Sequence, residues 1–161
     1  MRREGSTLIE ILAYSAIVAI LLQSAVLFFY STLDATNRIT ERNELLANQE
    51  LIENRLKWLF AQSSGISTPP VNSSGTSLTI SGASSTIYPA SLSLSSSSLL
   101  ISLPNTASTS LNSLRVNVLD FKVERPINSF STSTARIFIH LRSGVLSSIE
   151  STTTLIYSIP N

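Results

Sequence analysis

The chain has 161 residues, the length of one domain, and its net charge at pH 7 is only +1. It contains no cysteine and one histidine, which excludes disulfides, thiolate metal sites, a cysteine nucleophile and a histidine metal cluster. Charged residues make up 13% of the chain, about half the usual value for soluble domains, whereas 46 residues are Ser or Thr. This composition argues against a nucleic-acid binder and a cytosolic enzyme, and it is typical of a surface or secreted protein.

The N-terminal part of the chain contains a segment that is long and apolar enough to cross a membrane. Residues 11–30 carry no charge, and a helix of 20 residues spans roughly 30 Å, the thickness of a bilayer's hydrocarbon core. Arg2 and Arg3 precede the segment, and basic flanks of this kind stay in the cytoplasm. Because residues 31–35 offer only a poor site for signal peptidase, we expect the segment to be retained and the rest of the chain to lie outside the cytoplasm.

One long helix is predicted from this region onward, because no Gly or Pro lies between Thr7 and Gln62. Its expected length is about 56 residues, and Gly65 and the Pro69-Pro70 pair are expected to terminate it. The helix therefore combines an apolar first half with a charged second half.

The second half of the predicted helix is amphipathic. Its apolar stripe recurs at spacings of three and four residues and consists of Leu45, Gln49, Ile52, Leu56, Leu59 and Phe60. Charged residues, Glu41 among them, mostly fall off the stripe. Trp58 lies one position from the stripe and is expected to pack in the core. The stripe must pack on the part of the chain that follows the helix.

The remainder of the chain is predicted to form antiparallel strands with a polar outer face. Apolar and polar residues alternate in residues 78–80, 92–94, 99–103, 115–125, 135–141 and 151–159. The alternation changes phase at Val118-Leu119, which predicts a β-bulge at that point. Residues 95–98 are all Ser and could instead form a linker, although the alternation around them favours short strands and turns.

The predicted fold class is therefore α+β, with a long N-terminal helix packed on an antiparallel β-sheet head. The chain divides into a cytoplasmic leader (1–5), a transmembrane half of the helix (6–30), an amphipathic half (31–62) and a Ser/Thr-rich β head (63–161).

The junction of leader and helix reads Arg2-Arg3-Glu4-Gly5-Ser6-Thr7-Leu8-Ile9-Glu10. Glu10 lies in an apolar spanning segment, where a carboxylate costs on the order of 3 kcal/mol and should have a partner. A free α-amine on a neighbouring subunit would supply one. Thr7 and Glu10 also have the spacing of a capping box, in which Glu10 would serve only its own helix start. Glu10 alone leaves both interpretations open.

Taken together, the basic leader, Gly5, residues 7–10 and the apolar segment closely resemble the class III signal of type IV pilins and pseudopilins. The resemblance implies the pilin fold and cleavage between Gly5 and Ser6 by a membrane-bound prepilin peptidase. Ser6, where the family usually has Phe, would become the N-methylated N-terminus. Glu10 matches the charged residue that in this family is thought to pair with the new N-terminal amine during filament assembly.

A second resemblance concerns the type of subunit. Residues 51–56, 119–123 and 136–139 are similar to segments of the J-type minor pseudopilin of type II secretion and of the W-type minor pilin of type IV pili. We therefore expect a minor rather than a major subunit. Beyond residue 62 the only carboxylates are Asp120, Glu124 and Glu150, which make a poor calcium cage, so we expect no metal and no other cofactor.

The resemblance implies a structural function without catalysis. The expected partners are prepilin peptidase/methylase, other pilin or pseudopilin subunits, an inner-membrane assembly platform, and membrane lipid before assembly. The expected location is a single-pass membrane protein with a cytoplasmic N-terminus and an outer head, which later enters an extracellular or periplasmic filament. One alternative is an uncleaved, signal-anchored surface adhesin with a Ser/Thr-rich head.

Another alternative is a DNA-uptake pilin of a competence system. Removal of residues 1–5 takes away two Arg and one Glu, which leaves nine basic and nine acidic residues in the mature chain. A net charge of about zero disfavours nucleic acid as a partner. A local patch is conceivable only from Arg115, Lys122, Arg125, Arg136 and Arg142.

Overall fold

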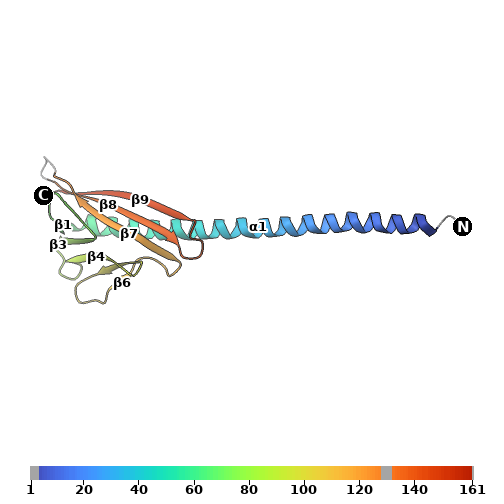
Figure 1. Cartoon of the computed structure of the whole chain (residues 1–161). Helices are drawn as coiled ribbons and strands as arrows, with labels where there is room; N and C mark the ends of the chain where they lie inside the picture. Colours follow the sequence, from blue (N-terminus) through green and yellow to red (C-terminus); the bar gives the residue numbers. More distant parts are fainter. Residues whose placement is uncertain (1–3, 128–131, 161) are drawn as a thin grey trace. The chain divides into compact units, whose positions relative to one another are not determined.

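The computed structural model describes residues 4–127 and 132–160 and has an α+β architecture, as predicted (Figure 1). Helix α1 (Glu4–Ala61) has 58 residues, and the prediction of one uninterrupted helix is confirmed. The chain forms two compact units, Met1–Thr40 and Glu41–Asn161. The described part of the first unit is helical throughout, whereas the second unit, called the head below, contains the last turns of α1 and all of the strands.

The strands of the head form two antiparallel sheets. The first sheet has the order β1-β3-β4-β5-β6 and consists of β1 (Ser63–Thr68), β3 (Ser77–Gly82), β4 (Ala90–Ser95), β5 (Ser98–Ser102) and β6 (Thr109–Ser110). The second sheet has the order β2-β7-β8-β9 and consists of β2 (Ser73–Gly75), β7 (Val116–Arg125), β8 (Thr132–Ser143) and β9 (Glu150–Pro160). The sequence predicted a single sheet, because alternation shows that a stretch is a strand but not which strands pair.

The predicted strands are present, and the irregularity in β7 lies where it was expected. In the pairing of β7 with β8, Val118 faces Leu141 and Asp120 faces His140, so Leu119 is the extra residue of a bulge. Val116 and Val118 before the bulge, and Phe121 and Val123 after it, are all buried. The bulge thus keeps both ends of β7 facing the core although their sequence parity differs.

The serine run at residues 95–98 forms the turn of a hairpin and not a linker. β4 and β5 pair from Ser91–Ser102 to Ser95–Ser98 without a register shift. Ser96 and Ser97 both have positive φ angles, 48° and 67°, the backbone twist that two-residue hairpin turns require. The prediction that residues 95–98 belong to short strands and a turn is confirmed.

One hydrophobic core unites the amphipathic half of α1 with both sheets. Leu56 and Leu59 of the predicted stripe are 0% exposed, and Gln49 lies half-buried at its edge. Tyr157 of β9 stacks on Phe60 with ring centroids 4.4 Å apart. Burial, reinforced by the charge of Glu53, raises the pKa of Tyr157 to about 12, so its hydroxyl remains protonated at any ordinary pH.

Three predictions about the second half of α1 are wrong. Trp58 is 36% exposed and packs against the guanidinium of Arg55, not in the core. Glu41 belongs to the charged residues that fall off the stripe, but it is only 5% exposed. The helix also ends at Ala61, and Gly65 lies within β1 and not in a terminating loop. Short strands such as β1 have too few alternating residues to be recognised in a sequence.

Candidate functional site

The residues implicated in processing lie at the start of α1. Gly5 and Ser6 belong to the first turns of the helix, which begins at Glu4. Arg2 and Arg3 of the leader lie outside the described residues. The helix start bears on the capping-box interpretation, because it places Thr7 inside the helix of the uncleaved chain. Thr7 is therefore not the N-cap residue of the uncleaved chain.

The first unit exposes an almost continuous apolar surface. Leu8 and Ile9 are 65% and 70% exposed, and Phe28 is 75% exposed. In the described part of the chain, α1 is the one helix that is long and apolar enough to cross a membrane, and it is consistent with a single membrane span. An apolar surface of this extent needs lipid or other apolar helices around it.

Three hydroxyl groups of this segment are satisfied within the helix itself. The hydroxyl groups of Ser15, Ser24 and Thr32 donate to backbone carbonyl oxygens three or four residues earlier, at 2.8–2.9 Å. Such local hydrogen bonds remove the need for water, so these residues are compatible with a hydrocarbon environment. Glu10 differs from them because a carboxylate cannot donate a hydrogen bond to its own backbone.

Glu10 has a side-chain partner one turn further along α1. The hydroxyl of Tyr14 donates a hydrogen bond to Oε1 of Glu10 at 3.3 Å, and both groups are exposed on the helix surface. This distance is long for a bond from a hydroxyl to a carboxylate, so most of the bonding capacity of Glu10 remains free. A cationic group from outside the segment can therefore approach the carboxylate.

The head contains a polar cluster that the sequence did not reveal. The buried carboxylate of Glu41 accepts a hydrogen bond from the hydroxyl of Ser143 at 2.8 Å and lies 3.3 Å from the guanidinium of Arg115. Arg115 also lies 3.4 Å from Glu44, which accepts a hydrogen bond from the hydroxyl of Ser113 at 3.1 Å. These contacts fix the beginning of the head's helical segment to the loop that precedes β7 and to the last residue of β8. They join residues about 70 to 100 positions apart, so no local sequence pattern could indicate them.

We expect Ser143→Ala to lower the free energy of unfolding of the head by about 1–3 kcal/mol. The Ser143 hydroxyl is the donor to Glu41 and also accepts hydrogen bonds from the backbone N–H groups of Val145 and Leu146. Its removal leaves a buried carboxylate with one partner fewer. Urea unfolding followed by circular dichroism measures the change, and Ser147→Ala, at an exposed position of the loop that follows β8, is the matched control. Equal stability of the two variants would contradict a structural role for the cluster.

The cations that could have formed a nucleic-acid patch are largely engaged with other groups of the head. Lys122 and Arg136 lie 2.7 Å and 3.9 Å from the carboxylate of Glu124. Arg125 donates to the backbone carbonyl of Ile66 at 2.6 Å. With Arg115 held by its two carboxylates, four of the five candidate cations have local partners.

The histidine and the acidic residues of the second sheet are not arranged as metal ligands in the described part of the chain. Nε2 of His140 lies 3.1 Å from the carboxylate of Glu150, on the exposed side of β8 and β9. Among the described residues, no group of three or more His, Asp or Glu side chains is placed to hold a metal ion.

A long apolar N-terminal helix whose second half packs on antiparallel sheets is compatible with a pilin-like architecture. Comparisons with protein-family models, curated proteins and solved structures found no match to this chain.

Proposed function

We propose that this protein is a structural subunit, of the minor type, of a type IV pilus-like filament or a type II secretion pseudopilus. The observation that carries the proposal is a single carboxylate, Glu10, in an exposed apolar helix, five residues after the Gly of a short basic leader. The leader supports cleavage between Gly5 and Ser6, and the helix supports storage in the membrane before assembly. The protein performs no catalysis in this proposal and is itself the substrate of prepilin peptidase/methylase.

The proposal gives the apolar helix two successive environments. In the membrane, lipid covers the exposed side chains of residues 8–33, and Tyr14 is the described partner of Glu10. In a filament, the helices of neighbouring subunits replace the lipid. Cleavage creates a cationic α-amine at Ser6, and the carboxylate of Glu10 on an adjacent helix is the charge that can neutralise it in an apolar core.

An uncleaved, signal-anchored adhesin is the second candidate function. The same apolar helix would serve as its membrane anchor. The many Ser and Thr residues would keep the head soluble without a filament around it. A DNA-uptake pilin has less support, because most of its candidate cations have local partners in the head.

The mature N-terminus distinguishes filament subunit from anchor. Mass spectrometry of the protein from cells with active prepilin peptidase is expected to show a chain beginning at Ser6, with the mass of an N-methyl group. A chain that still begins at Met1 in such cells would eliminate the filament proposal and leave the anchored adhesin.

A further inference from the structure

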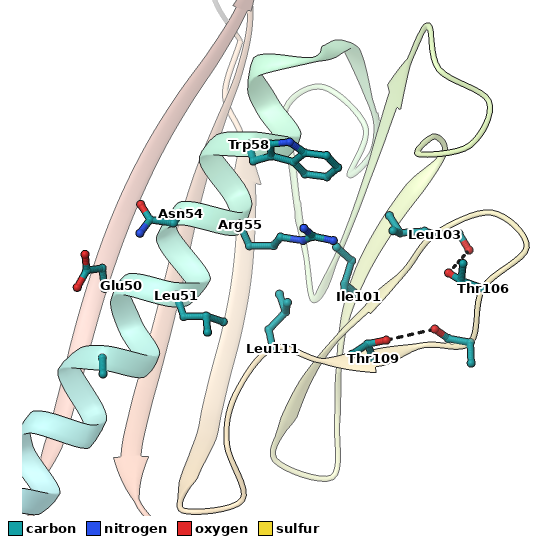
Figure 2. A pocket seen from close by; sticks show the side chains of 12 residues that line it. Glu50, Leu51, Asn54, Arg55, Trp58, Ile101, Leu103, Thr106, Thr109 and Leu111 are labelled. Carbon is teal, nitrogen blue, oxygen red and sulfur yellow. Dashed lines mark hydrogen bonds between the residues drawn. The ribbon is translucent and has the colours of Figure 1, made fainter.

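The head carries an open groove between α1 and the end of the first sheet, with a volume of about 740 Å³. Its base and walls are mainly apolar and include Leu51, Trp58, Ile101, Leu103 and Leu111 (Figure 2). Leu51 is 53% exposed although it lies beside residues of the core. The hydrophobic core of the head is therefore left open on this side, and the groove offers apolar surface to a binding partner.

A charged residue lies in the middle of this apolar surface. Figure 2 shows the side chain of Arg55 reaching from α1 toward Ile101, with Trp58 one turn further along the helix. The guanidinium lies 4.5 Å from the centre of the Trp58 ring, and the residue is half-buried. Within residues 4–127 and 132–160, no carboxylate and no hydrogen-bond acceptor is paired with Arg55. On the second sheet, by contrast, Lys122 and Arg136 share the carboxylate of Glu124.

We propose that this groove binds an amphipathic helix of a partner protein, through apolar side chains and one Asp or Glu that pairs with Arg55. A half-buried guanidinium in an apolar setting lacks much of its hydration, so a carboxylate brought to it forms a strong bidentate pair. The proposal adds a specific partner surface in the head, and its test does not depend on cleavage or polymerisation.

The shape of the groove favours a helix over a single acyl chain. Its lining on α1 runs from Ala47 to Trp58, about 16 Å or three helical turns. The groove is open along its side, so an acyl chain in it would remain largely in water. A helix with apolar residues at i, i+3 or i+4, and i+7 would bury its apolar face there and keep its polar face in solvent.

A second copy of this chain is a poor occupant because its charges are in the wrong order. Along α1, the groove presents Glu50 first and Arg55 five residues later. The exposed helix of the chain itself presents Asp34 first and Arg38 four residues later. Two copies anchored at the same depth in one membrane run parallel and in register, so Asp34 of one copy lies about 24 Å along the helix axis from Glu50 of the other. An axial shift that brought this segment to the groove would place like charges opposite each other at both positions, so the partner is a different protein.

Trp58 is the only tryptophan of the chain, so its fluorescence reports directly on the groove. The experiment uses the full chain in phospholipid vesicles and a panel of three-turn helical peptides with Leu at the i, i+4 and i+7 positions. Each peptide carries one Glu at a different position. At least one member is expected to change the Trp58 emission in a saturable way. Replacement of the Glu of that peptide by Gln should weaken the binding of the peptide about tenfold. Arg55→Gln in the protein should weaken it by the same factor.

Two variants separate the ion pair from a general loss of structure. Lys57→Gln removes an exposed cation that does not line the groove, and it should bind the peptide like the parent chain. Arg55→Glu should lose the Glu peptide and bind the same peptide with Arg in place of Glu.

Several outcomes would overturn the proposal. One is the absence of saturable binding by any peptide of the panel. Another is an equal effect of Arg55→Gln and Lys57→Gln on peptide binding. The third is failure of Arg55→Glu to bind the peptide that carries Arg in place of Glu. Saturable binding of dodecanoate in place of the peptides would identify a lipid site. An emission change that depends only on protein concentration would identify a second copy as the occupant.

Discussion

Replacement of Gly5 by Leu is expected to abolish processing and to leave the full-length precursor in the membrane, absent from any filament. Gly5 corresponds to the residue before the proposed scissile bond, where the backbone must approach the catalytic site of the peptidase closely. A residue without a side chain permits that approach, whereas the branched side chain of Leu obstructs it. Because cleavage precedes assembly in the proposed function, one substitution should remove both.

Intact-mass measurement of the membrane fraction and of sheared filaments tests this expectation. Ala13→Leu is the matched control, because it adds the same side chain within the exposed apolar segment, eight positions beyond Gly5. The control should be cleaved to a chain that begins at Ser6. Normal cleavage and assembly of Gly5→Leu would show that the leader resembles a prepilin signal without functioning as one.

The elements of this fold with strong periodicity could be predicted from the sequence. The uninterrupted helix follows from the lack of Gly and Pro between Thr7 and Gln62, and α1 covers that stretch. The bulge in β7 follows from the change of phase at Val118-Leu119. Both features depend on residues that are close together in the chain, and local patterns are sufficient to specify them.

The division of the strands into two sheets could not be predicted. β2 has three residues and pairs with β7, about fifty positions later. β6 has only two residues. Neither is long enough to show an alternation, and the pairing of distant strands depends on contacts that the sequence does not display.

The burial of Glu41 and the exposure of Trp58 on α1 both depend on residues that are distant in the sequence. Glu41 has the sequence context of a solvated residue, and only the distant Ser143 and Arg115 make its burial possible. Trp58 lies one position from the apolar stripe, and the groove between α1 and the first sheet leaves its side chain partly exposed. The predictions for Gly5, Ser6 and Glu10 have a different basis from those for Glu41 and Trp58. They rest on the resemblance of the N-terminus to a prepilin signal and not on packing.

Removal of the Glu10 carboxylate is expected to separate membrane storage from assembly. Glu10→Ala should be cleaved between Gly5 and Ser6 as usual, because the carboxylate lies beyond the bond. The monomer should remain in the membrane at least as stably, since a costly charge has been removed from an apolar segment. Incorporation into filaments should nevertheless fall at least tenfold. The N-terminal amine of a docking subunit would lose its counter-charge, and an unpaired buried charge typically costs about 3–5 kcal/mol.

Thr7→Val supplies the comparison that identifies the cause. This substitution keeps the shape of the side chain and removes the hydroxyl that a capping box would use, which costs only about 1 kcal/mol. If Glu10 acts on a neighbouring subunit, the filament-bound fraction of Glu10→Ala falls sharply while that of Thr7→Val stays near the parent value. If Glu10 serves only its own helix start after cleavage, the two variants lose a similar small amount. Assembly of both variants at the parent level would remove Glu10 from the proposed site, because its charge would then have no function in the filament.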